Sequence, residues 1–223
     1  GGSIGIPFYI SQSLSAALYI AGFTEGWLML FPDHPAVVIS ISAWLILLII
    51  SYVSTLFAIR FQYVILAIIG ISIVSFLLSP YEKSTGNFLI GTFEDAGFWA
   101  VFAVFFPAVT GIMAGANLSG ELRNPRKSIP KGTMSAIAVT LVIYVVLAYA
   151  LSLVSSPDEL RNNQMVMVDK ALFGPLVIIG ILAATFSSAL GSLVGAPRIL
   201  QALAEHKTIV FHKFFVKRSE TGE

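Results

Sequence analysis

The sequence predicts an all-α integral membrane protein, and three observations support this fold class. Of the 223 residues, 57% are hydrophobic and only 11% are charged, and the mean hydropathy is +0.87. The apolar residues form about six segments long enough to cross a bilayer as helices, which takes about 20 residues each. One of these segments is interrupted in its middle. A soluble domain of this length does not have such a composition, so that class is excluded.

The six predicted spans and the segment after them follow from hydropathy along the chain. The spans cover residues 5–29, 36–57, 61–78, 98–120, 132–152 and 175–204. The connection at Arg60 is very short and predicts a tight antiparallel hairpin. Residues 206–217 mix basic and aromatic side chains and predict a short amphipathic helix on the membrane surface. Because the chain begins without methionine and ends in a polar loop, we expect a fragment of a longer protein.

The distribution of basic residues predicts the orientation of the spans. Ten of the thirteen lysines and arginines fall in one set of connections: Arg60, Arg123, Arg126, Lys127, Lys131, Arg198, Lys207, Lys213, Lys217 and Arg218. The opposite set holds Lys83, Arg161 and Lys170. Cytoplasmic loops carry the excess of basic residues. We therefore expect a multi-pass cell-membrane protein whose connections at Arg60, at Glu121–Lys131 and after Ala204 are cytoplasmic.

The fourth span, 98–120, contains residues that interrupt a helix. Pro107 removes a backbone donor, Gly111 allows unusual dihedral angles, and the β-branched Val109 and Thr110 lie between them. Backbone groups released at bilayer depth need a partner, so such a break is tolerated where it is buried in protein or lines a cavity. In secondary transporters the partner is an ion or a substrate. An ordinary proline kink is the alternative, and this stretch alone does not decide between them.

Three spans place hydroxyl groups near the middle of the membrane, and no charged side chain accompanies them. Tyr19 lies far from the ends of its span, where interfacial tyrosines are found, and Thr110 and the pair Ser187 and Ser188 lie at a similar depth. Close helix packing would explain small residues here, although it explains two adjacent hydroxyls less well. A cation bound by neutral oxygens is best balanced by a neighbouring anion. The pattern therefore favours co-transport of salt.

At these residues the sequence resembles the cation–chloride cotransporter family of the amino acid–polyamine–cation superfamily. The similar stretches are Gly1–Gly5 with Ala17–Phe23, Phe105–Gly132, and Ala184–Leu190 with Ala196–Arg198 and Gln201–Leu203. They resemble the third, sixth and eighth helices of that family. The resemblance implies a LeuT-type inverted-repeat fold in which this chain supplies helices three to eight of twelve. The first and tenth helices, which complete the ion sites in the family, lie outside the chain.

The resemblance also implies the roles of individual residues. Potassium would be bound by Tyr19, Pro107 and Thr110, and chloride by the backbone N–H groups of Gly111, Ile112 and Met113. Sodium would be bound by Ala184, Ser187 and Ser188. The serine pair favours sodium coupling and Tyr19 favours potassium, so the sequence is most similar to the sodium–potassium–chloride type. The implied mechanism is electroneutral symport by alternating access.

Other function classes are weighed against this hypothesis. The runner-up is an amino acid or polyamine permease of the same superfamily, and a channel or a non-transporting subunit is a further alternative. An intramembrane enzyme would need a base or metal ligands beside its nucleophile. The spans of this chain place neither beside Ser187 and Ser188, so we expect no catalysis. We expect no cofactor, no metal beyond the transported alkali cations and no nucleic-acid partner. The expected partners are the ions and the lipid bilayer, and dimers are common in the family resembled.

Overall fold

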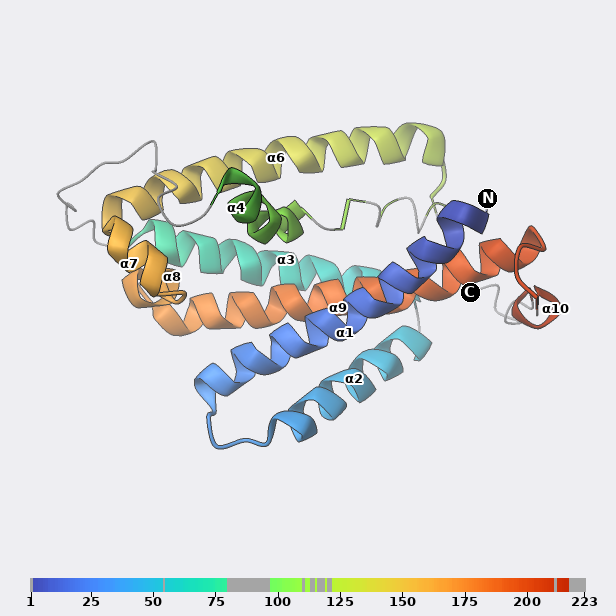
Figure 1. The fold of residues 1–223 in the computed structure, drawn as a ribbon, viewed down its shortest axis with the longest axis horizontal. Helices are drawn as coiled ribbons and strands as arrows, with labels where there is room; N and C mark the ends of the chain where they lie inside the picture. The colour runs from blue at the N-terminus through green and yellow to red at the C-terminus, as the bar shows by residue number, and fades with distance from the viewer. Residues whose placement is uncertain are drawn as a thin grey trace. The chain divides into compact units, whose positions relative to one another are not determined.

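The computed structural model describes residues 2–53, 55–79, 97–109, 111–112, 115, 119, 122–210 and 212–216, and for 53, 55–59, 104, 107 and 109 it describes the backbone only. In this part of the chain every regular element is helical (Figure 1). The elements are α1 (Gly2–Leu30), α2 (Ala36–Val53), α3 (Thr55–Leu77), α4 (Phe98–Phe105), the 3-10 helix η1 (Phe106–Val109), α6 (Pro125–Val154), α7 (Pro157–Asn162), α8 (Val166–Lys170), α9 (Gly174–Glu205) and α10 (His212–Phe215).

Four of the described helices are long and apolar enough to cross a membrane. They cover Gly2–Leu30, Arg60–Leu77, Pro125–Val154 and Gly174–Glu205. A shorter apolar helix covers Ala36–Tyr52. With no strand among the described residues, these helices confirm the predicted all-α membrane class.

The predicted connection at Arg60 is wrong, because Arg60 lies inside α3, which begins at Thr55. No glycine or proline occurs between Ala36 and Ile69, so the sequence contains no residue that would end a helix at Arg60. The loop predicted at Glu121–Lys131 is likewise shorter, since α6 begins at Pro125. Proline suits the first turn of a helix, where its missing N–H would have no partner.

The predicted amphipathic helix over 206–217 is also wrong in extent, since the described residues there are helical only at His212–Phe215. Helix α9 ends in a Schellman-type turn: the N–H of Thr208 donates to Leu203 O at 2.9 Å and that of Lys207 to Ala204 O at 2.9 Å. Lys207 has a φ of 54°, in the left-handed region. The β-branched residues that follow it disfavour immediate helix formation.

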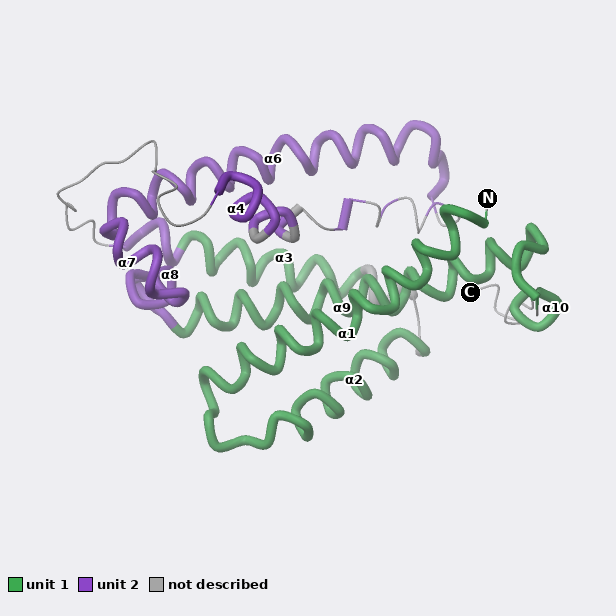
Figure 2. The backbone as a smooth tube through the Cα atoms, in the orientation of Figure 1, with its two compact units in different colours: residues 1–74, 175–223 green, residues 75–174 purple. Residues whose placement is uncertain are grey.

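Two compact units make up the chain (Figure 2). Unit 1 contains residues 1–74 and 175–223, and unit 2 contains residues 75–174. In unit 1, α9 packs against both α1 and α3 through glycines. A Cβ added to Gly26 of α1 would lie 3.1 Å from Leu182, and one added to Gly5 would lie 2.5 Å from Leu203. Small residues allow such close approach of membrane helices.

Gly180 of α9 makes the closest approach to α3, because an added Cβ would lie 2.5 Å from the Cβ of Ser72. We expect Gly180→Ala to lower the stability of the full-length protein by about 1–3 kcal/mol through overpacking. The measurement is the thermal midpoint in detergent. Gly70→Ala on α3 is the matched control, since nothing lies within 4 Å of its added Cβ. Ser72→Gly should restore the stability of the Gly180→Ala protein, and a midpoint unchanged in Gly180→Ala itself would contradict the packing.

In unit 2, the short helices α7 and α8 lie in the connection between α6 and α9, where the sequence predicts no membrane span. Ser156 caps α7 by accepting a hydrogen bond from the Glu159 N–H at 3.2 Å. Glu159 also pairs with Lys170 at 3.0 Å, which ties α7 to α8. Ser75 on the last turn of α3 accepts a hydrogen bond from the Phe173 N–H at 3.2 Å. These bonds order the connection around the end of α3.

Aromatic rings close the turn between α1 and α2 in unit 1. The indole N–H of Trp27 donates to Nδ1 of His34 at 3.0 Å, and the His34 ring stacks on Phe31 with centroids 5.2 Å apart and planes 11° apart. An imidazole nitrogen that accepts a hydrogen bond carries no proton. The neutral ring therefore holds its proton on Nε2.

Candidate functional site

The interrupted helix breaks between Phe105 and Gly111. Helix α4 ends at Phe105, a single 3-10 turn covers Phe106–Val109, and Gly111 has a φ of +90°. This left-handed value cannot continue a right-handed helix, and glycine adopts it without steric cost. The residues that end the helix are therefore the ones that the sequence singled out, and Pro107 lies inside the 3-10 turn.

Tyr144 of α6 stabilises the break and was missed by the sequence reading. Its hydroxyl donates to the carbonyl oxygen of Ala108 at 2.8 Å, and its ring meets Phe105 edge to face with centroids 5.9 Å apart. In a continuous α-helix this carbonyl would accept from the N–H four residues later. A sequence signal existed, because Tyr144 lies well inside its predicted span, as Tyr19 does.

The predicted potassium and chloride residues are described only in part. Thr110 and Met113 lie outside the described residues, and for Pro107 only the backbone is described. Gly111 and Ile112 form a turn, and the Ile112 side chain is 49% exposed. Tyr19 is half-buried and belongs to unit 1, whereas the other residues of these two predicted sites belong to unit 2. Both sites remain predictions.

The predicted sodium residues Ala184, Ser187 and Ser188 lie together on successive turns of α9. The Ser188 hydroxyl donates to the carbonyl oxygen of Ala184 at 2.9 Å, so two of the three predicted ligands are already in contact. Ser187 makes no hydrogen bond to the residues that the structure describes, although serines in helices commonly bond back to the preceding turn. All three residues are half-buried. The sodium site remains a prediction.

Tyr19 lies level with the serine pair within unit 1. Helices α1 and α9 are antiparallel: Gly22 lies opposite Thr185, with an added Cβ 3.4 Å away, and Gly26 lies opposite Leu182. Tyr19 lies three residues before Gly22, and Ser188 lies three residues after Thr185. By this register the backbone of Tyr19 lies at about the depth of Ser188 on the neighbouring helix.

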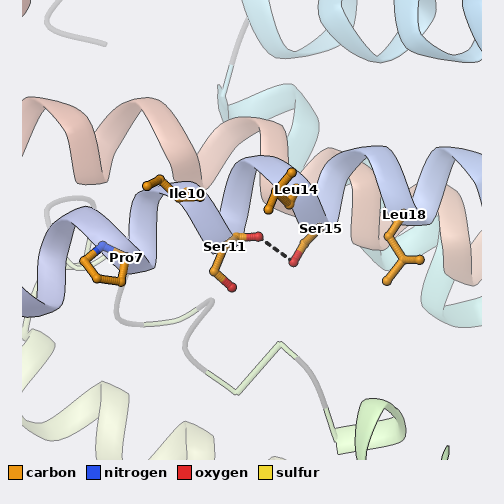
Figure 3. Close-up of a pocket in the computed structure, with 6 residues that line it drawn as sticks. All are labelled: Pro7, Ile10, Ser11, Leu14, Ser15 and Leu18. Carbon is orange, nitrogen blue, oxygen red and sulfur yellow. Dashed lines mark hydrogen bonds between the residues drawn. The ribbon is translucent and has the colours of Figure 1, made fainter.

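A groove runs along α1 on the N-terminal side of Tyr19. It has a volume of about 570 Å³, and Figure 3 shows the side chains that line it: Pro7, Ile10, Ser11, Leu14, Ser15 and Leu18. The Ser15 hydroxyl donates to the Ser11 carbonyl at 2.8 Å. The walls are mainly apolar, with Leu14 and Leu18 each 66% exposed. Ser11 and Ser15 continue the face of Tyr19 at four-residue spacing.

Comparison with known proteins places the chain in a family. Residues 1–223 match the family model described as "Amino acid permease". The chain is 33% identical to mouse solute carrier family 12 member 8 over 94% of its length and 32% of that protein's. It is 32% identical to mouse solute carrier family 12 member 1 over 97% of its length, and 31% identical to mouse member 2 over the same share. These stretches cover 26% and 23% of the two relatives.

The chain therefore spans about a quarter to a third of the length of these relatives. The resemblance to cation–chloride cotransporters is confirmed, because solute carrier family 12 comprises those proteins. The family implies a LeuT-like fold and consists of transporters rather than enzymes, in agreement with both predictions. Four of its described helices are long and apolar enough to cross a membrane, and together with these relatives they show an integral membrane protein. The chain belongs to the amino acid permease family.

Proposed function

We propose that this chain is part of a secondary transporter that carries chloride with potassium and sodium across the cell membrane by alternating access. The observation that carries the proposal is the cluster of Ala184, Ser187 and Ser188, level with Tyr19 on the neighbouring helix. Its oxygens are neutral and suit alkali cations, which transporters bind through carbonyl and hydroxyl oxygens. Cation–chloride cotransporter relatives support the same class.

The proposed sites divide the ions among the helices. Sodium binds to the Ala184 carbonyl and the two serine hydroxyls. Potassium binds to the Tyr19 hydroxyl, the Pro107 carbonyl and Thr110, and chloride binds to the N–H groups of residues 111–113. Because the cation ligands are neutral, an adjacent chloride lowers the electrostatic cost of holding cations in the membrane. Ligands from the first and tenth helices of a longer protein complete these sites.

The positions of the loops and the assembly are part of the proposal. From the excess of basic residues we infer that the N-terminus of α1 and the region after Ala204 face the cytoplasm. Helices α1 and α9 belong to a scaffold against which the interrupted helix moves. A homodimer in the lipid bilayer is the assembly common among such transporters.

The test is rubidium uptake by the full-length protein in liposomes, with rubidium standing in for potassium. We expect uptake to require both sodium and chloride. Uptake that needs chloride but ignores sodium would support potassium–chloride transport and leave the serine pair as packing. If rubidium is not taken up in any medium, and amino acids compete with one another for uptake, the result would support a second candidate function. That candidate, an amino acid or polyamine permease, is favoured by the description of the matched family model.

A further inference from the structure

Gln62 of α3 is a polar residue at an apolar helix interface. It is the third residue of the apolar stretch Arg60–Leu77 and is half-buried. Its Nε2 atom lies 3.8 Å from the position that a Cβ on Gly191 of α9 would occupy. The carboxamide makes no hydrogen bond to the residues that the structure describes. Carboxamides in membrane spans normally pair with a polar group on a neighbouring helix. Toward the described residues, Gln62 therefore has unused hydrogen-bonding and coordinating capacity.

The packing of α3 on α9 brings this carboxamide close to the serine pair. Gly191 lies four residues after Ser187 and three after Ser188, and residues at these spacings on a helix have Cβ atoms about 5–6 Å apart. The register is fixed at a second point, where Gly180 meets Ser72, and by the rings of Phe61 and Phe186, whose centroids are 6.4 Å apart. Gln62 thus contacts the turn of α9 that follows Ser187 and Ser188, on the C-terminal side of the serine pair.

We propose that Gln62 is a further ligand of the cation bound at Ala184, Ser187 and Ser188. A half-turn about its last side-chain bond exchanges Nε2 with Oε1, and this amide oxygen is a neutral acceptor of the same kind as the Ala184 carbonyl. The cluster supplies oxygens from one helix only, and a ligand from α3 would close its other side. The inference rests on the proposed sodium site and extends it to a second helix of this chain, α3.

The experiment measures the sodium dependence of rubidium uptake by the full-length protein in liposomes. Gln62→Leu removes the oxygen at similar size, and we expect the half-saturating sodium concentration to rise about tenfold, with those for rubidium and chloride unchanged. Gln62→Glu keeps the oxygens and should retain sodium affinity. Ser72→Ala, on the same helix and also at the contact with α9, is the matched control and should behave as the parent.

Each failure is distinguishable. If uptake by the parent protein ignores sodium, the proposed function fails. If Ser188→Ala raises the half-saturating sodium concentration while Gln62→Leu does not, only the present inference is overturned. A role in packing alone would lower the amount of folded protein in both Gln62 variants without changing sodium affinity, and that result also overturns it. If Gln62→Leu does not transport, the rise in thermal midpoint caused by sodium is measured on the purified variant. A smaller rise than in the parent supports the inference. A rise equal to that of the parent contradicts it.

Discussion

Replacing Ser187 and Ser188 together by alanine should raise the half-saturating sodium concentration for rubidium uptake by more than tenfold. The double change removes two of the three oxygens in the α9 cluster and leaves the Ala184 carbonyl alone. A tenfold change in affinity corresponds to about 1.4 kcal/mol, a modest value for the loss of two cation ligands. Uptake into liposomes at varied sodium, with potassium and chloride saturating, provides the measurement.

The control for this prediction is Ser192→Ala, which changes a buried serine about one turn further along α9. It should leave the sodium dependence unchanged, because Ser192 belongs to the helix packing. Single variants add information about the cluster. Ser188→Ala also frees the Ala184 carbonyl from its hydrogen bond, whereas Ser187→Ala removes a hydroxyl without a described partner. Sodium dependence equal to that of the parent in the double variant would assign the pair to packing.

Tyr19→Phe should raise the half-saturating rubidium concentration about tenfold, because the change removes one proposed ligand oxygen and keeps the ring. Thr110→Ala should act in the same direction. The matched control is Tyr9→Phe, the identical change on α1 and one that the proposal places outside the ion site. Uptake at varied rubidium, with sodium and chloride saturating, measures the effect. Rubidium dependence equal to that of the parent in both Tyr19→Phe and Thr110→Ala would contradict the assignment of these residues to the potassium site.

The sequence predicted features that depend on a residue's own chemistry. Pro107 and Gly111 mark the end of a helix because each imposes a backbone constraint locally, and the break occurs between Phe105 and Gly111. The limits of α3 were not predictable from Arg60, since a helix extends beyond the bilayer edge when no residue stops it. Helix α7 could have been found, because Ser156 followed by Glu159 is a recognised capping pattern.

The contacts between helices required the structure. Several serines in the sequence lie on predicted spans, and nothing local tells that Ser72 meets Gly180 or that Gln62 meets Gly191. These pairs join residues more than 100 positions apart, so they depend on the register in which two helices pack. Tyr144 shows the same limit: its depth was visible in the sequence, but its acceptor was not.

The glycine contacts between α1 and α9 have a consequence for ion discrimination. Gly5, Gly22 and Gly26 meet α9 at points spread over about 30 Å of helix, so the two helices cannot slide without forcing side chains out of these positions. The axial offset between Tyr19 and Ser188 is therefore set by packing, whatever ion is present. If the proposed ion sites are correct, selection between cations of different radius would depend on ligands from other helices, whose positions this packing does not fix.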